Sequence, residues 1–270
     1  MGAEENKDAN IKGTIEAVTG LVKEIPIYQD AVQPAAKEIG KSLETITKTV
    51  NIALSPIKAL VWGYEKIEDY LAKRISEKLK DIPEEDITTP SLHIAGPAVE
   101  ALRFTGHNEN LRELYASLLA MAMNTQTADK VHPAYVEVIK NLSTEEAILL
   151  QSFVAKSQYP KVDIEEKEKN IKGSKTRIRN FTLFHKMDDR LDVNLVPIYL
   201  DNLNRLGIIE IIHDSYFVDT SEYQTLESDD SISEFIEEIK ARGKDVEFTK
   251  GIITLTSFGR NFVKNVVAMK

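Results

Sequence analysis

Residues 108–124, NENLRELYASLLAMAMN, predict the fold of this chain most directly. Asn108 is a residue type that caps helices, because its side-chain oxygen can accept a hydrogen bond from a free backbone N–H. The apolar residues that follow Asn108 are Leu111, Leu114, Leu118, Leu119 and Ala122. Their spacings of three and four positions place them on one face of a helix. We therefore predict a capped helix whose apolar face meets a hydrophobic core.

A helix is predicted before this stretch and another after it. Gly96-Pro97 begins the first, and Gly106 is a residue type that ends helices. After the stretch, residues 125–133 (TQTADKVHP) read as a loop, and His132-Pro133 starts a helix. The apolar residues are Val99 and Leu102 in the first helix, and Tyr135, Val136 and Ile139 in the second.

The helix that comes next carries a two-part cap. In NLSTEEAILLQSF, residues 141–153, the Ser143 side chain can accept a hydrogen bond from the N–H of Glu146. The Glu146 side chain can reach back to the N–H of Ser143, which completes a capping box. We expect this helix to run to about Ser157.

The N-terminal third carries one long apolar pattern. From Ile11 to Leu71, apolar residues recur alternately every four and every three positions, and Gln29 is the one polar exception. This register is typical of an amphipathic helical surface. Ser55-Pro56 indicates either a new helix start or a kink inside a longer helix. Because prolines argue against one straight rod, the predicted helices lie near residues 11–25, 34–54 and 56–80.

Three interpretations of this apolar stripe stay open. It can face the protein's own core, form a seam for self-association or for a protein partner, or touch a lipid surface. The lipid interpretation depends on residues 50–64, VNIALSPIKALVWGY, which contain the only tryptophan, Trp62. This window is too short to cross a bilayer and is interrupted by Lys58, although an interfacial helix has a similar composition. We expect a homo-oligomer that assembles through these helices.

The charge pattern of the C-terminal third differs from that of the rest. The mixed-charge run at residues 161–175 is expected to be a solvated helix or a linker. Residues 176–184, TRIRNFTLF, are aromatic and β-branched, which fits a short strand or an irregular segment. Residues 221–245 are predicted to be an acidic insertion.

Regular elements are predicted between and after these segments. A helix over residues 194–206 ends at Gly207, and residues 208–220 are strand-like with a turn at 213–215. A strand at GIITLTSF, residues 251–258, leads into a last helix capped by Thr256. The apolar face of that helix is Phe258, Phe262, Val263, Val266 and Val267.

The chain thus divides into three predicted parts. Residues 1–82 form an N-terminal amphipathic helical region, which ends at the acidic, proline-containing stretch 81–90 (DIPEEDITTP). Residues 91–158 form a compact helical domain, and residues 159–270 form a small α+β module that resembles a winged helix. The predicted fold class is mainly α.

A winged helix raises the question of DNA binding. Binding a duplex requires several Arg and Lys residues to neutralise phosphates. The helix at 194–206 carries one base, Arg205, and an opposing acid, Asp201, while the chain has a net charge of -9. We therefore expect no nucleic acid partner and predict that the module recognises a protein. The nearest basic residues are Lys172, Lys175, Arg177 and Arg179.

The histidines predict no metal site. None has another histidine at the third or fourth position, which is the spacing of zinc ligands on a helix. His132 before Pro133 is typical of a residue that caps or packs at a helix start, although Asp129 is close in the sequence. Asp188-Asp189, just after His185, are expected to cap a helix start and to be solvated. The remaining histidines, His93, His107 and His213, are isolated in the sequence.

Composition and motifs exclude several classes of function. The chain has no cysteine, which rules out disulfides and thiolate chemistry. The motifs GxGxxG, GxxxxGK[ST], GxSxG and HExxH are absent from the sequence. The first residues, MGAEENKDAN, are polar and acidic, so we expect no secretory signal and a cytoplasmic protein. We predict a protein without catalytic residues, metal or cofactor.

Three features occur together in the middle of the chain. They are LRELYASLLAMAMN at 111–124, His132-Pro133 before a short helix, and Leu142-Ser143 before the acidic capped helix. In these features the chain resembles the abortive infection alpha family of bacterial proteins. SPIKALVWGYEKI, LNRLGIIEI and ITLTSFGRNFVKNVV resemble other parts of the family, so the resemblance spans residues 35–268. It implies defence against bacteriophage, and the family has no agreed catalytic residues to transfer.

We therefore expect a non-enzymatic interaction protein of bacterial anti-phage defence. It would act through assembly of the N-terminal helices or through partner binding. Two alternatives are a winged-helix transcription regulator and a membrane-active toxin that uses residues 50–64.

Overall fold

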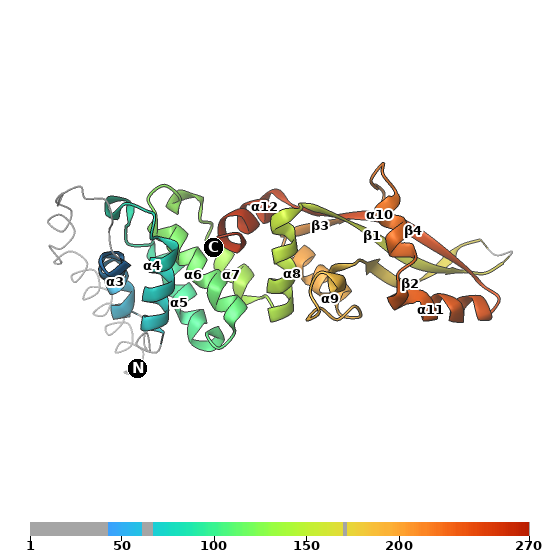
Figure 1. The fold of residues 1–270 in the computed structure, drawn as a ribbon, viewed down its shortest axis with the longest axis horizontal. Coiled ribbons are helices and arrows are strands. Elements are labelled where there is room, and N and C mark those ends of the chain that lie inside the picture. The colour runs from blue at the N-terminus through green and yellow to red at the C-terminus, as the bar shows by residue number, and fades with distance from the viewer. Residues whose placement is uncertain (1–42, 61–66, 170–171, 270) are drawn as a thin grey trace, which may run out of the picture. The chain divides into compact units, whose positions relative to one another are not determined.

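The computed structural model describes residues 43–60, 67–169 and 172–269 (Figure 1). The predicted helix near 11–25, the stripe from Ile11 to Ile39 and Trp62 lie outside the described residues. The chain from Leu43 onward forms one compact unit. It is mostly helical and contains a four-stranded antiparallel sheet.

Helix α6 lies at the centre of the helical part. It is surrounded by α4, α5, α7, α8 and the C-terminal π-helical turn η5. The helices are α3 (Leu43–Leu60), α4 (Glu68–Lys78), α5 (Leu92–Thr105), α6 (Glu109–Met123), α7 (Ala134–Lys140) and α8 (Thr144–Ala155), with short 3-10 turns at Glu84–Asp86 and Ala128–Lys130.

The predicted cap and apolar face of α6 are confirmed. The Asn108 side chain accepts a hydrogen bond from the N–H of Leu111 at 3.2 Å. However, α6 is buried on more than the predicted face, because Ala116, Ser117 and Ala120 are buried as well. A helix that is buried all round must be covered on every side by other elements, which explains why α4, α5, α7, α8, η5 and the 3-10 turn at Ala128–Lys130 all pack against it.

The neighbouring helices also follow the prediction, with one shift. In α8, Ser143 Oγ accepts from the N–H of Glu146 at 3.1 Å, and Glu146 Oε2 accepts from the N–H of Ser143 at 2.7 Å. Helix α5 begins at Leu92 rather than after Pro97, because the carbonyl of Ser91 already accepts the first helical hydrogen bonds. Pro97 therefore lies inside the helix.

The described part of the apolar stripe faces the protein's own core. Its members Ile46, Val50, Ala53, Ile57 and Leu71 are buried in one cluster with residues of α5 to α8. Helix α3 continues through Pro56, so the predicted boundary between residues 54 and 56 was wrong and the alternative of a longer helix that contains Pro56 holds. The core-facing interpretation is therefore confirmed for these five stripe residues. None of the described helices has the length and hydrophobicity needed to cross a membrane.

The sheet has the strand order β2-β1-β4-β3, and all its pairs are antiparallel. Strand β1 pairs with β4 from Gln158↔Thr254 to Lys167↔Asp245. The elements of this part are β1 (Gln158–Lys167), β2 (Ser174–Phe181), α9 (Val196–Arg205), β3 (Ile209–Ile212), α10 (Ser221–Glu227), α11 (Asp230–Ala241), β4 (Asp245–Leu255), α12 (Ser257–Phe262) and η5 (Val263–Val267), with a 3-10 turn at Phe184–Lys186.

The prediction of a solvated helix or linker at residues 161–175 was wrong. This run contains most of β1 and the start of β2. Val162 and Ile164 point into a second apolar core, whereas Lys161 and Asp163 alternate with them and form an ion pair at 2.7 Å. Alternation of this kind defines a strand with two different faces, and the ion pair accounts for the burial of the charged Lys161 and Asp163.

The acidic stretch 221–245 is a structural part of the sheet module rather than an added insertion. It forms α10, α11 and the first residue of β4, and both helices pack along the sheet (Figure 1). Tyr223, Leu226 and Ile232 cover Val162 and Ile164, so the apolar residues between the acids complete the second core. The strand-like segment 208–220 is a strand only at Ile209–Ile212.

Several predicted helix boundaries are confirmed in the C-terminal part of the chain. Gly207 follows α9 with a positive φ of 71°, which glycine adopts without strain. Thr256 caps α12 by accepting from the N–H of Gly259 at 2.9 Å. The winged-helix assignment and the division at residues 81–90 stay predictions, although one core contains residues from both sides of that stretch.

We predict that Gly259→Ala lowers the free energy of unfolding by about 2–3 kcal/mol, because overpacking strains the backbone. A Cβ at Gly259 would lie 1.8 Å from the backbone oxygen of Ile208. Gly96→Ala in α5 is the matched control, because a Cβ there meets no described atom within 4 Å. It should stabilise the protein by about 0.5–1 kcal/mol. Urea unfolding followed by circular dichroism measures both, and equal effects would contradict the packing at Gly259.

Candidate functional site

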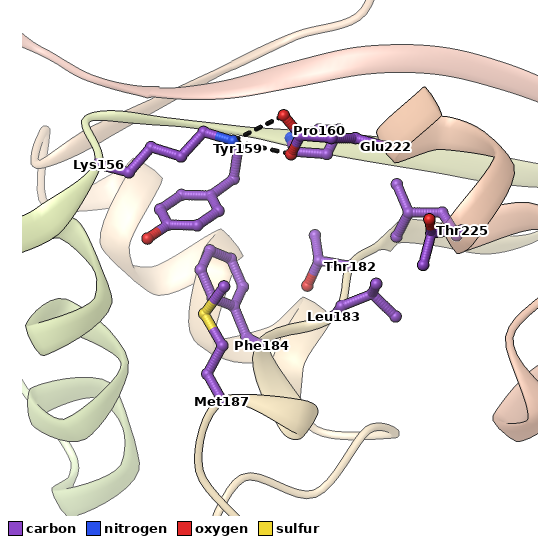
Figure 2. A pocket seen from close by; sticks show the side chains of 10 residues that line it. Lys156, Tyr159, Pro160, Thr182, Leu183, Phe184, Met187, Glu222 and Thr225 are labelled. Atoms are coloured by element: carbon purple, nitrogen blue, oxygen red, sulfur yellow. Dashed lines mark hydrogen bonds and ion pairs between the residues drawn. The ribbon is translucent and has the colours of Figure 1, made fainter. Parts of the chain in front are cut away.

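A pocket of about 290 Å³ lies where α8 leads into the sheet, and we call it the β1–α10 pocket (Figure 2). It is lined mostly by apolar side chains from the start of β1, the end of β2 with the turn that follows, and α10. The lining residues are Lys156, Tyr159, Pro160, Thr182, Leu183, Phe184, Met187, Glu222, Thr225 and Leu226.

Aromatic rings form a rigid wall of this pocket. The rings of Tyr159 and Phe184 lie 4.8 Å apart between centroids, and Phe153 of α8 packs edge-on to Tyr159 at 5.2 Å. The Tyr159 hydroxyl donates to the carbonyl of Ser152 at 2.6 Å. Because its polar end is satisfied inside the protein, Tyr159 presents apolar surface to the pocket.

One ion pair crosses the mouth of the pocket. Lys156 Nζ donates to both carboxylate oxygens of Glu222, at 2.8 and 2.7 Å, and so links the end of α8 to α10. The same ammonium lies 5.5 Å from the ring centroid of Tyr159 and 5.7 Å from that of Phe217. The two side chains are 43% and 49% exposed, so water screens the pair and its net contribution to stability is small.

The lining also contains a buried hydroxyl group. Thr182 is 3% exposed, and its Oγ1 has no hydrogen-bond partner among the described residues. A buried polar group without a partner costs free energy. A polar atom of a bound molecule that reached this hydroxyl would therefore be stabilised.

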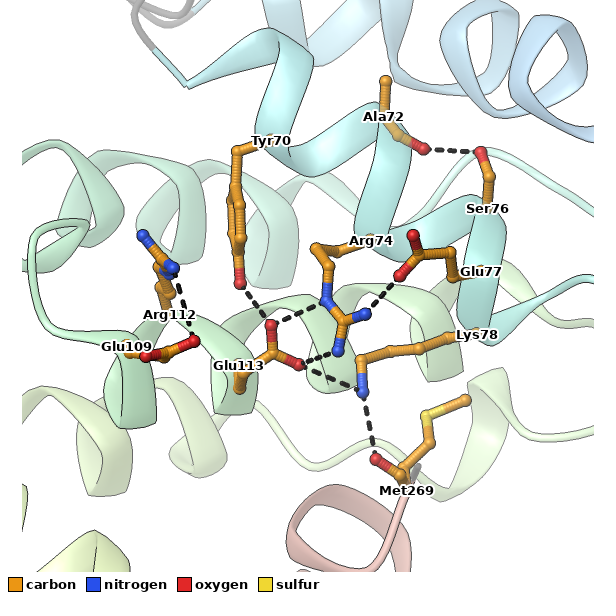
Figure 3. Close-up of polar contacts among 10 residues, drawn as sticks. All are labelled: Tyr70, Ala72, Arg74, Ser76, Glu77, Lys78, Glu109, Arg112, Glu113 and Met269. Atoms are coloured by element: carbon orange, nitrogen blue, oxygen red, sulfur yellow. Dashed lines mark hydrogen bonds and ion pairs between the residues drawn. The ribbon is translucent and has the colours of Figure 1, made fainter. Parts of the chain in front are cut away.

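A second cluster, the Glu113 network, joins α4 to α6 (Figure 3). The Glu113 carboxylate accepts from the Tyr70 hydroxyl at 2.8 Å and from Arg74 Nε and Nη2 at 2.7 and 2.6 Å. Burial alone would raise the pKa of Glu113, but the hydrogen bonds from Arg74 and Tyr70 hold it below its ordinary value. The carboxylate is thus kept ionised by donors on the neighbouring helix.

Lys78 extends this network to the C-terminal end. Its side chain is 3% exposed, and its Nζ donates to the backbone oxygen of Met269 at 3.0 Å and lies 3.5 Å from Glu113 Oε2. Burial lowers the pKa of Lys78, and the charge of Glu113 opposes that effect. A polar cavity of about 230 Å³ adjoins these groups. Because Arg74, Lys78 and Glu113 bind each other, the cluster acts as a structural link between helices.

The structure confirms one of the two predicted helix-start roles. His132 Nδ1 accepts from the N–H of Ala134 at 3.1 Å, and its ring packs against Tyr135 and Phe258, so it caps and packs at a helix start. Asp188 was wrongly predicted to cap a helix start, because it lies in a turn and the next helix, α9, begins at Val196. Its carboxylate accepts from the guanidinium and the backbone N–H of Arg190, which lowers the pKa of Asp188 to about 2.

His213 is isolated in the sequence, but the fold brings it into contact with Lys161. Its Nδ1 lies 2.8 Å from Nζ of Lys161, which is fully buried and also donates to Asp163 at 2.7 Å. These residues meet because β1 and β3 flank β4. The sequence signal for the contact between Lys161 and Asp163 was their spacing by two positions, which places both side chains on the same face of a strand. No three His, Cys, Asp or Glu side chains in residues 43–60, 67–169 and 172–269 are placed to hold a metal ion.

Comparisons with known proteins give one family and one structure. The family model described as abortive infection alpha matches residues 63–266, a range that contains the β1–α10 pocket and the side chains of the Glu113 network. No curated protein matches the chain. The chain is similar to an uncharacterized protein from the hydrocarbon-degrading marine bacterium Alcanivorax borkumensis SK2, at 15% identity, 48% coverage of this chain, 90% coverage of that chain and a TM-score of 0.34.

We predict that Glu113→Gln lowers the free energy of unfolding by about 1–3 kcal/mol, because Arg74 and Lys78 lose their shared counter-charge. The control is Glu137→Gln, since Glu137 is exposed and lies 3.7 Å from an exposed Lys140. Its effect should stay within about 0.5 kcal/mol. Urea unfolding at neutral pH measures both variants, and similar effects would show that the network adds little stability.

The effect of Glu113→Gln should also depend on pH. The pKa of Glu113 in the folded protein lies below its ordinary value of 4.5. Its contribution is therefore fully present above that value and is lost as pH falls through the folded pKa. We expect wild type and variant to differ less in unfolding free energy at about pH 3 than at about pH 6. A difference that does not shrink in acid would contradict this ion network.

Proposed function

Because the chain belongs to the abortive infection alpha family, we propose that it acts in anti-phage defence as a binding protein, with the β1–α10 pocket as its binding site. Family membership supports the role in abortive infection. The observation that carries the choice of a binding role is the pocket itself, which combines aromatic walls with a buried, unpartnered hydroxyl of Thr182.

The ionisable groups of the lining favour binding over catalysis. Lys156 and Glu222 neutralise each other through two hydrogen bonds. Nucleophilic or acid–base catalysis requires a nucleophile or a proton donor within reach of an activating partner and a substrate. Groups that are bound to each other at the mouth serve instead to position a molecule or to close the pocket over it.

Assembly through the N-terminal stripe remains part of this proposal in a narrower form. The stripe residues Ile46, Val50, Ala53, Ile57 and Leu71 are used in the protein's own core. A protein partner or a second copy would therefore bind through Ile11 to Ile39, which lie outside the described residues. A homo-oligomer of this kind would bring several β1–α10 pockets into one assembly.

The contacts of charged and apolar residues support this role over the two alternatives. Arg205 of α9 donates to the Asn202 side chain, and Arg177 pairs with Glu166 at 2.9 Å, so both are engaged within the protein rather than free for phosphates. In the window 50–64, Val50 and Ile57 are buried in the core and are thus withdrawn from a lipid surface.

A plaque assay tests the proposal. Cells that express the wild-type gene should give fewer plaques than cells with an empty vector, across a panel of phages. Thr225→Trp places a large ring at the pocket mouth and should return plaque counts to those of the vector. Gln224→Trp, also exposed on α10 but outside the lining, is the matched control and should keep protection.

Each outcome decides a separate part of the proposal. Wild-type protein that protects against no phage in the panel would overturn the defence role. Full protection by Thr225→Trp would overturn the assignment of the pocket as the binding site, provided that immunoblots show equal amounts of both variants.

A further inference from the structure

We infer that the β1–α10 pocket binds a small anionic amphiphile, namely a carboxylate that carries a short apolar chain or ring, with Lys156 as its counter-ion. This inference rests on the proposed binding function and specifies the chemical class of the ligand. It follows from the size of the pocket, from the chemistry of its walls and from the way in which Lys156 is held.

Size and walls define the apolar part of the ligand. A volume of about 290 Å³ is at the lower end of the range for small-molecule sites. The rings of Tyr159 and Phe184 and the side chain of Leu226 are buried and present apolar surface. Removing a hydrocarbon group from water against such surface is favourable, so a chain or ring of modest length fits here.

The contacts of Lys156 define the charged part. Its ammonium is held by the Tyr159 ring, the Phe217 ring and the Glu222 carboxylate. If a ligand carboxylate replaces that of Glu222, Lys156 can keep its contacts with both rings. The Glu222 side chain then rotates into the solvent on the exposed surface of α10. An ammonium ligand would instead have to displace Lys156 from two rings and a carboxylate together. The site therefore favours an anion over a cation.

The exchange of one carboxylate for another costs little. Both members of the pair are partly exposed, and an exposed ion pair contributes little net free energy. A ligand carboxylate that is anchored by its apolar group has a high effective concentration at Lys156. The apolar group thus supplies the affinity, and Lys156 selects the head group.

Thr182 is the second observation that points to a ligand. Its hydroxyl is buried and has no partner among the described residues, although it belongs to the pocket lining. Figure 2 shows the Lys156–Glu222 pair at one side of the pocket and Met187 at the other, with the Tyr159 and Phe184 rings between them. A ligand oxygen that accepts from Thr182 would be stabilised in this otherwise apolar setting.

The test compares three probes of equal chain length and different head groups. Octanoate, 1-octanol and octylammonium are titrated into the full-length protein by isothermal titration calorimetry at pH 7.5. We expect octanoate to bind most tightly and octylammonium least tightly. Acetate, which has the same head group without the chain, should give no detectable heat. Octanol or octylammonium binding as tightly as octanoate would overturn the inference.

Variants at the mouth test the role of Lys156 directly. Lys156→Gln should weaken octanoate binding by about fivefold, the value of a solvent-exposed ion pair, and leave octanol unchanged. Glu222→Gln removes the competing carboxylate and should tighten octanoate binding, a gain that misfolding cannot produce. Lys140→Gln, on α7 and outside the lining, is the matched control and should bind like wild type. Unchanged octanoate affinity in both mouth variants would refute the assigned role of Lys156.

These titrations and the plaque assay fail independently. If Thr225→Trp loses protection but octanoate does not bind the wild-type protein, the ligand class is wrong and the binding site stands. If octanoate binds through Lys156 but the wild-type gene protects against no phage, the defence role is wrong and the ligand class stands.

Discussion

The constraint on which the rest of this structure depends is that α6 is buried on every side. Small side chains such as Ala116, Ser117 and Ala120 let neighbouring elements approach closely, and no face of the helix is left for solvent along most of its length. The chain must therefore provide α4, α5, α7, α8 and η5 as cover. Glu113, near the start of α6, then meets donors from α4 because α4 is held against it.

The same packing explains where the pocket lies. Helix α8 packs on α6 and ends at Ala155, and β1 begins at Gln158, so Lys156 and Ser157 alone connect helix and strand. This short connection places Lys156 and Tyr159 at the junction of the two cores. One face of β1 packs against α10 and α11 through Val162 and Ile164, and α10 in turn brings Glu222 to Lys156. The pocket is thus a consequence of how a helical bundle and a sheet are joined.

Local signals in the sequence predicted the helical part well. Asn108, Ser143 with Glu146, and Thr256 cap helices through hydrogen bonds to residues only three positions away, so their geometry is independent of distant elements. Strand β1 was missed because Lys161, Asp163 and Glu166 give it the composition of a solvated segment. Glu166 is paired with Arg177 and Lys244, and Lys161 contacts His213. These partners come from other strands or loops and carry no signal in the local sequence.

The sequence by itself determined the helix caps, the apolar face of α6, the repeating apolar stripe (though not the surface that it meets) and the resemblance to a family. Each of these depends on residues within a few positions of one another or on a repeating pattern. Only the tertiary structure decided the sheet order, the cover provided by α10 and α11, the Glu113 network and the β1–α10 pocket. Lys156 and Glu222 are 66 residues apart, and their meeting depends on β1 and α10 packing together, which no local propensity specifies.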